Sequence, residues 1–129
     1  GLIDPGQRER AISEAEKLLG RFREHDVFLE IDAASERMHE IPYTRPHPTW
    51  GSDSGRIDLL YRVNDAWHLL DFKTDEIRDD ETLVKALDEH RPQVGRYAEA
   101  VQQLLEETPQ AALCFLDALG EVKVVLVEA

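Results

Sequence analysis

The sequence predicts an α/β domain in which a mixed β-sheet of about five strands is flanked by helices. An amphipathic helical stretch opens the chain, three strand-like segments follow it, and a long helix separates them from two further strands. The predicted order is helix, short helix, three strands, helix, two strands. In such an order the long helix crosses over the sheet, so the strand after it can pair in parallel with the third strand.

Composition indicates one globular domain over residues 1–129. The chain has 129 residues, a length that is enough for one core and too short for two ordinary domains. Its hydrophobic content of 42% is that of a globular protein. No apolar run approaches the length of a membrane span, and residues 1–5 show no signal-peptide pattern, so we expect a cytoplasmic location. Cys114 is the single cysteine, which excludes an internal disulfide and a cysteine-based zinc or iron–sulfur site.

The charge of the chain leaves two interpretations open. It has 27 acidic and 15 basic residues, for a formal net charge of −12. Such a charge repels nucleic acid and supplies little of the counterion-release affinity that nucleic-acid binding needs. The chain could be a protein interaction module, or a nuclease domain whose DNA is held by another polypeptide or by a further part of its own chain.

Two helices are predicted at the start of the chain. The first covers residues 7–25, and Glu14 and Glu16 are expected on its solvated face. Asp26 is predicted to cap a short second helix, Phe28–Glu36. The apolar positions at helical spacing are Ile12, Ala15, Leu18, Leu19 and Phe22 in the first helix, and Phe28, Leu29, Ile31 and Ala34 in the second.

A strand is predicted from Arg37 to Thr44, where Pro42 indicates an edge strand or a bulge. The composition then changes to proline, glycine, serine and aspartate, so Arg45–Ser54 is predicted to be a loop. His39 and His47 lie in these segments and could be metal ligands. Surface positions and strand contacts are the commoner roles of such histidines.

The next two strands form a hairpin with a predictable register. Gly55–Val63 and Trp67–Lys73 are strand-like and are joined by the turn signal Asn64-Asp65. Pairing back from this turn places Asp58 opposite Asp71 on the neighbouring strand. Like charges directly opposite on paired strands are unfavourable, so a cation shared by the two carboxylates would remove the conflict.

The end of the second hairpin strand combines a carboxylate and an ammonium group. Asp71 and Lys73 point to the same face, because strand side chains alternate with a period of two. Mg²⁺ takes hard oxygen ligands and usually only one or two protein carboxylates. The spacing therefore suits holding a phosphate and a water molecule together. The alternative is a strand-end salt bridge between Asp71 and Lys73 without a metal.

The second half of the chain adds a helix and a hairpin. The charged stretch Thr74–Glu81 is predicted to be mobile, and a helix is predicted over Glu89–Glu107 with Pro92 in its first turn. Gln93 and Tyr97 are four residues apart and share a face near the helix N-terminus, where backbone N–H groups favour an anion. Alternatively, Tyr97 is a core residue and Gln93 is exposed. The last predicted strands are Ala111–Leu116 and Val122–Val127, which turn at Gly120.

Four short blocks follow one another in the chain: Glu40–Tyr43, Gly55–Asp58, Asp71–Thr74 and Gln93–Tyr97. With these blocks, residues 36–129 resemble the PD-(D/E)XK nuclease superfamily, and specifically the RecB- and AddA-type C-terminal nuclease domain of helicase–nucleases. The order and spacing of the blocks make the combined match more specific than any single block. The resemblance implies a restriction-endonuclease-like core with the element order α-βββ-α-ββ.

The resemblance also implies metal-dependent hydrolysis of DNA, expected to be exonucleolytic, with Mg²⁺ or Mn²⁺ as the cofactor. Asp58 and Asp71 would be metal ligands, with the backbone carbonyl of Phe72 as a third. Lys73 would orient the attacking water and stabilise negative charge in the transition state. Help in positioning the phosphodiester is implied for Gln93 and Tyr97.

The chain departs from the family pattern in one ligand. These nucleases generally have a further metal-binding histidine or glutamate on a helix before the first strand, and no histidine precedes His25. Glu14 or Glu16 could replace it, although their periodicity favours solvent. Glu40 matches a recurrent glutamate of the family and would be either structural or catalytic.

These observations favour a nuclease domain that is part of a larger helicase–nuclease acting in DNA double-strand break repair. A helicase motor, in the same chain or as a separate subunit, would deliver the DNA in spite of the acidic surface. The alternatives are a catalytically silent docking module of the same fold and a stand-alone nuclease of mobile-element or restriction type. The set of Asp58, Asp71 and Lys73 argues against the silent module.

Overall fold

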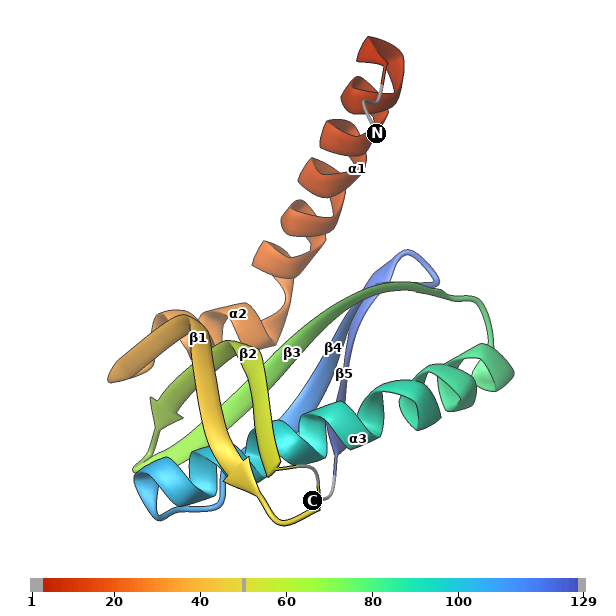
Figure 1. Cartoon of the computed structure of the whole chain (residues 1–129). Helices are drawn as coiled ribbons and strands as arrows, with labels where there is room; N and C mark the ends of the chain where they lie inside the picture. Colours follow the sequence, from red (N-terminus) through yellow and green to blue (C-terminus); the bar gives the residue numbers. More distant parts are fainter. Residues whose placement is uncertain (1–3, 50, 128–129) are drawn as a thin grey trace.

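The computed structural model describes residues 4–49 and 51–127, and it confirms an α/β domain built on a five-stranded mixed sheet (Figure 1). Residues 1–3, part of the stretch without a signal-peptide pattern, and residue 50, in the predicted loop, lie outside these ranges. Within the two ranges, no helix is both long and apolar enough to cross a membrane. The elements are α1 (Pro5–Glu24), α2 (Asp26–Asp32), β1 (Glu36–His47), β2 (Gly51–Val63), β3 (Ala66–Ile77), α3 (Asp80–Leu105), β4 (Gln110–Ala118) and β5 (Glu121–Val127).

The sheet follows the order of the chain from β1 to β5. β3 and β4 are parallel, and all other neighbouring strands are antiparallel. α3 is the crossover between the two parallel strands and covers one face of the sheet, whereas α1 and α2 pack on the other (Figure 1). Each face has its own buried cluster, with Ile57, Leu69, Val94, Val101 and Phe115 on the α3 side and Leu18, Ile31, Leu59, Leu70 and Cys114 on the α1 side.

α1 forms where the apolar spacing predicts it, but little of it is buried. Asp4 accepts a hydrogen bond from the Gln7 N–H at 2.8 Å, and the Gln7 side chain accepts one from the Asp4 N–H, which completes a capping box. Leu18 is buried, whereas Ile12 and Leu19 are 49% and 50% exposed. The reason is that α1 extends away from the sheet and approaches it only near its C-terminal end (Figure 1).

α2 starts earlier and ends earlier than the predicted helix Phe28–Glu36. The predicted cap is wrong: the Nδ1 atom of His25 accepts a hydrogen bond from the Val27 N–H at 3.0 Å, so His25 is the N-cap. Asp26 is instead the first residue of the helix, where its negative charge interacts favourably with the helix dipole. An imidazole acceptor can thus take the capping role that sequence rules assign to aspartate.

The predicted loop Arg45–Ser54 is wrong, since β1 and β2 continue through most of it as a hairpin. Arg45 pairs with Asp53 across the hairpin, and both side chains are buried, with Arg45 Nε 3.2 Å from Asp53 Oδ2. This opposite-charge pair stabilises strands whose composition is typical of a loop. Pro42 and Pro46 are tolerated because β1 is an edge strand, where a missing N–H donor need not break the sheet.

The prediction of a mobile stretch over Thr74–Glu81 is also wrong. β3 continues to Ile77, which is buried and pairs with Ala118 of β4. The pairing register of β3 and β4 shifts between Lys73 and Glu76, which indicates a bulge in this part of β3. The sequence did not indicate this extension of β3, because only the last of the residues 74–77 is apolar and the others are polar or charged.

α3 begins at Asp80, well before the predicted start at Glu89. Asp79 is its N-cap and accepts a hydrogen bond from the Thr82 N–H at 2.8 Å. Pro92 therefore lies inside the helix and not in its first turn. Proline at this depth removes one bond from the helical ladder, which the packing of α3 on the sheet must offset.

The two predicted hairpin turns are confirmed. Asn64 and Asp65 have φ angles of 52° and 63° and connect β2 to β3. Leu119 and Gly120 have φ angles of 53° and 81° and connect β4 to β5. Positive φ at both central residues is the turn geometry whose twist matches that of the flanking strands. These turns fix the register of their hairpins.

Candidate functional site

Two carboxylates lie where β2 and β3 separate. The ladder between these strands runs from Val63↔Ala66 to Leu59↔Leu70, as the turn predicts, and no further pairs form. Asp58 and Asp71 occupy the next position. Asp58 Oδ2 accepts a hydrogen bond from the backbone N–H of Phe72 at 2.9 Å, so a side chain replaces the backbone acceptor there. The strands therefore fork at the two aspartates.

Asp71 carries a charge in an environment that disfavours it. The residue is only 3% exposed. Burial, followed by the neighbouring Asp58 carboxyl group, raises the pKa of Asp71 from 3.8 to about 6, although Lys73 opposes the shift. Lys73 Nζ forms an ion pair with Asp71 Oδ2 at 3.0 Å, and this buried oxygen has no well-formed hydrogen bond among the described residues.

This arrangement fits a hard divalent cation. A buried carboxylate oxygen normally has a hydrogen-bond partner, and here the ion pair with Lys73 compensates the charge only in part, since the pKa of Asp71 stays raised. A cation between Asp58 and Asp71 would satisfy that oxygen and offset the repulsion between the two groups. Phe72 lies between Asp71 and Lys73 in the chain, and its backbone N–H donates a hydrogen bond to Asp58. The Phe72 carbonyl group belongs to the same segment and is a further oxygen donor.

Lys73 is held from a second side by α3. Its Nζ donates a hydrogen bond to Gln93 Oε1 at 3.1 Å. Lys73 has 18% of its side chain exposed, so the ammonium group keeps some contact with solvent while Asp71 and Gln93 fix its position. The structure thus brings Gln93 of α3, 20 residues after Lys73 in the sequence, to Asp71 and Lys73 of β3.

Tyr97 lies on the same side of the site, one helical turn after Gln93. Burial, followed by the charge of Asp71, raises the pKa of Tyr97, so its phenol is protonated near neutral pH and can donate a hydrogen bond. Its ring packs edge-to-face on Tyr43 with centroids 5.8 Å apart. Gly55 leaves room for both rings, because a Cβ at this position would be 2.9 Å from Tyr97 Cε1. Tyr97 is both a core residue and a neighbour of the carboxylates.

Glu40 lies on the strand beside Asp58. Its neighbours His39 and Ile41 pair with Leu59 and Ile57, so Glu40 is at the level of Asp58 on β2. It is exposed, and its φ of 48° places it in the left-handed region, which glutamate seldom adopts. The edge strand is distorted at this residue, next to the fork.

The other candidates from the sequence are not placed at the fork. Glu14 and Glu16 are exposed on α1, which packs on the opposite face of the sheet from α3. His39 is exposed, and His47 Nδ1 accepts a hydrogen bond from the Thr49 N–H at 3.1 Å. An apolar cavity of about 430 Å³ also lies on the α1 side, lined by residues that include Phe22, Phe28, Ile31, Leu59 and Phe72.

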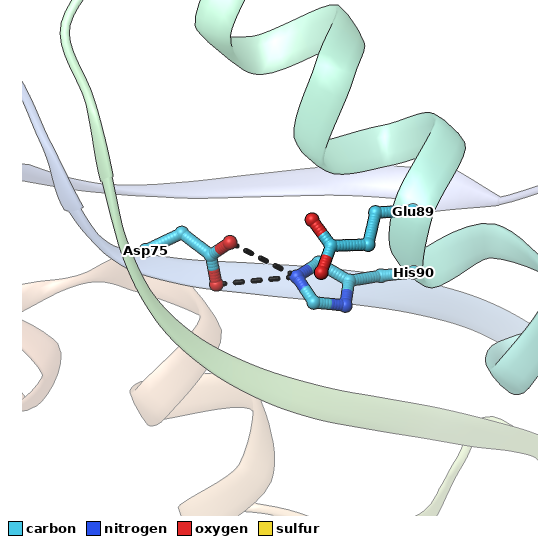
Figure 2. Close-up of side chains that lie close together, drawn as sticks. All are labelled: Asp75, Glu89 and His90. Carbon is cyan, nitrogen blue, oxygen red and sulfur yellow. Dashed lines mark hydrogen bonds and ion pairs between the residues drawn. The ribbon is translucent and has the colours of Figure 1, made fainter.

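Two polar groups were not predicted from the sequence. One is the buried pair of Arg45 and Asp53, which Arg45 Nη2 extends to Glu99 Oε2 of α3 at 2.8 Å. The other is a cluster of Asp75, Glu89 and His90 between β3 and α3 (Figure 2). Neither has a local sequence signal, because each joins a residue of the predicted helix to a segment that the sequence assigned to a loop or a mobile stretch.

Comparisons with known proteins give one family model and two similar proteins. A family model described as the PD-(D/E)XK nuclease superfamily matches residues 5–128. The chain is 30% identical over 130 residues to an ATP-dependent helicase/nuclease subunit of Heliobacterium modesticaldum, and the match covers 88% of this chain and 9% of that protein. The crystal structure of protein VC1899 from Vibrio cholerae matches 87% of this chain and 27% of its own chain, at 20% identity and a TM-score of 0.39.

Proposed function

The chain belongs to the PD-(D/E)XK nuclease superfamily, and from this premise we propose that it is a Mg²⁺- or Mn²⁺-dependent deoxyribonuclease domain. The observation that carries the proposal is the buried Asp71 oxygen, which has no hydrogen bond, adjoins Asp58 and lies 3.0 Å from the Lys73 ammonium group. Two carboxylates beside the fixed ammonium group of Lys73 suit a phosphodiester substrate.

Asp58 and Asp71 would hold the metal ion, with the Phe72 carbonyl as a third oxygen ligand and Glu40 as a further candidate. When bound, the ion would act as a Lewis acid on the phosphate and lower the pKa of a bound water molecule. The all-oxygen donor set matches the preference of Mg²⁺ and Mn²⁺.

Lys73, Gln93 and Tyr97 would act on the substrate directly or through one another. Hydrolysis forms a bond between a water oxygen and phosphorus and breaks one ester bond, which leaves a phosphate monoester and a sugar hydroxyl group. Lys73 would orient the water and stabilise the negative charge that develops on the phosphate. Gln93 would keep the Lys73 ammonium group in place through the 3.1 Å hydrogen bond, and the Tyr97 phenol would donate to a phosphate oxygen.

We place this domain in an ATP-dependent helicase–nuclease that acts in double-strand break repair. The net charge of −12 opposes unaided binding of DNA, so a helicase motor, in the same chain or as a separate subunit, would feed a strand to the site. The similarity to a helicase/nuclease subunit, of which this chain spans 9%, supports that context. Stepwise delivery of a strand favours exonucleolytic digestion.

Degradation of labelled single-stranded DNA with Mn²⁺ tests the activity. We expect cleavage by the wild type and a loss of at least ~100-fold in kcat for Lys73→Ala, since removing one charge-stabilising donor has an effect of this order. Lys17→Ala, at an exposed lysine of α1, is the matched control and should cleave at the wild-type rate.

Two results would contradict the proposal. Cleavage by Lys73→Ala at the wild-type rate would assign the activity to another site. No cleavage by the wild type, in a sample that binds Mn²⁺ by calorimetry, would favour the catalytically silent docking module.

A further inference from the structure

A second group of metal-binding side chains lies beyond the fork. Asp75 follows Lys73 by two residues on β3, in the part of the strand where the register with β4 shifts. Glu89 and His90 are consecutive residues of α3, and both side chains approach Asp75 (Figure 2). None of the three has a role in the hydrolysis described above.

The donor atoms of these side chains are close together. His90 Nε2 lies 3.0 Å and 3.2 Å from the two carboxylate oxygens of Asp75. One oxygen of Glu89, one of Asp75 and one nitrogen of His90 all lie within 4.8 Å of one another. Figure 2 shows the Glu89 carboxylate beside the imidazole ring, with the ring nitrogen directed at Asp75.

We propose that Asp75, Glu89 and His90 form a second cation site that takes a divalent transition metal of the Zn²⁺ class. Ligand atoms at about 2.1 Å from a tetrahedral Zn²⁺ are about 3.4 Å from each other. The contact between Asp75 and His90 is already near this spacing, and the ligand oxygen of the exposed Glu89 side chain, within 4.8 Å of the other two donors, would move closer to complete it. Two carboxylates with a neutral imidazole also balance a charge of +2.

The donor types set this site apart from the fork. The fork offers oxygen atoms alone, which suit Mg²⁺, whereas an imidazole nitrogen raises the affinity for Zn²⁺, Ni²⁺ and Co²⁺ far above that for Mg²⁺. A metal ion here would link the end of β3 to α3, two elements that also position Lys73 and Gln93. The inference does not depend on nuclease activity.

An ion pair without metal is the competing interpretation. A protonated His90 would satisfy Asp75 through the observed contact. That pairing gives Glu89 no function, although it lies within reach of the same nitrogen. A metal ion uses all three side chains, so the requirement for Glu89 separates the two interpretations.

Calorimetric titration of the Asp58→Asn/Asp71→Asn double variant with ZnCl₂ and with MgCl₂ tests the proposal. These substitutions remove the fork as a metal site and also its charge repulsion, so the fold should persist, and circular dichroism verifies it. We expect one Zn²⁺ bound per chain, with an affinity at least ~10-fold higher than that for Mg²⁺. His90→Gln in the same background should lower the Zn²⁺ affinity at least ~10-fold, and Glu89→Gln should lower it measurably.

His68→Gln is the matched control, because His68 Nδ1 also faces one carboxylate, at 4.0 Å from Glu30. It should leave Zn²⁺ binding unchanged. If the double variant does not fold, the wild type with its fork saturated by excess MgCl₂ serves in its place. The proposal is overturned if Zn²⁺ does not bind, or if it binds equally well after His90→Gln. Either failure leaves Mg²⁺ binding at the fork, and with it the proposed nuclease function, untouched.

Discussion

The two clusters of metal-binding side chains on β3 differ in how well the protein alone satisfies them. At the fork, Asp71 is 3% exposed, the carboxylate of Asp58 lies beside it just past the end of the β2–β3 ladder, and one Asp71 oxygen has no hydrogen bond among the described residues. In the second cluster, Asp75 is 34% exposed at its side chain and both of its oxygens contact His90. A cation would therefore relieve an unfavourable arrangement at the fork, whereas the second cluster is already satisfied by its own side chains.

The difference follows from the elements that supply the donors. The fork takes both carboxylates from strands whose register is fixed by a two-residue turn, so neither can move away from the other. The second cluster takes one donor from a bulged strand and two from a helix, one of them on an exposed, flexible side chain. A rigid frame can keep like charges together, which is also what a reaction site requires.

The largest expected effect is on catalysis. Replacing either carboxylate of the fork by an isosteric amide, Asp58→Asn or Asp71→Asn, removes a metal ligand and should lower kcat for single-stranded DNA on the order of 1,000-fold. Asp88→Asn, at an exposed position of α3, is the control and should retain the wild-type rate. Substantial activity in either fork variant would mean that the two clusters do not differ in function as described.

The second effect is on stability in metal-free buffer. Because the pKa of Asp71 is raised from 3.8 to about 6 in the folded chain, folding takes up a proton between these pH values and the wild type loses stability as the pH rises through this window. Asp71→Asn lacks this loss. We expect the variant to match the wild type near pH 4 and to exceed it by up to about 3 kcal/mol at pH 7, as urea unfolding would show.

Magnesium should reverse that order, because it binds the wild-type fork and stabilises the folded state by mass action. A wild type that is as stable as Asp71→Asn at pH 7 without metal would show that the fork is not strained.

A third effect tests the packing that supports the fork. Gly55→Ala places a Cβ 2.9 Å from Tyr97 Cε1 and 3.1 Å from the Tyr43 ring, so both rings must move. We expect a loss of about 1–3 kcal/mol in unfolding free energy and a lower kcat, with Mg²⁺ affinity retained. Gly95→Ala is the control, since a Cβ there meets nothing within 4 Å and alanine favours the helix. A Gly55→Ala chain with the wild-type melting temperature would refute the close packing.

The smallest effect belongs to the second cluster. Without metal, His90→Gln removes a partly exposed ion pair with Asp75 and should lower the unfolding free energy by less than about 1 kcal/mol. Thermal unfolding in buffer with chelator measures it. A larger loss would mean that the ion pair of His90 and Asp75 is itself important for the unfolding free energy, so the two clusters would not differ in their contribution to stability.

The sequence predicted that Asp58 and Asp71 lie next to each other on β2 and β3, although not that the ladder ends just before them, because the hairpin register depends on local rules. A two-residue turn sets the register, and the register alone places Asp58 beside Asp71. The second cluster could not be predicted, because the charged end of β3, which supplies Asp75, pairs with β4 and not with a neighbour in sequence, so the pattern did not place it in the sheet. The buried pair of Arg45 and Asp53 was not predicted either, because the proline, glycine and serine residues around it are typical of a loop.

Calorimetric titration of the metal-free chain with MgCl₂ and MnCl₂ tests most directly whether Asp58 and Asp71 share one cation. We expect one site of this kind per wild-type chain, and a drop in affinity of at least ~10-fold in both Asp58→Asn and Asp71→Asn. Removing both carboxylates should cost less than the sum of the two single effects, because they serve the same ion. Wild-type affinity in either single variant would contradict the shared site.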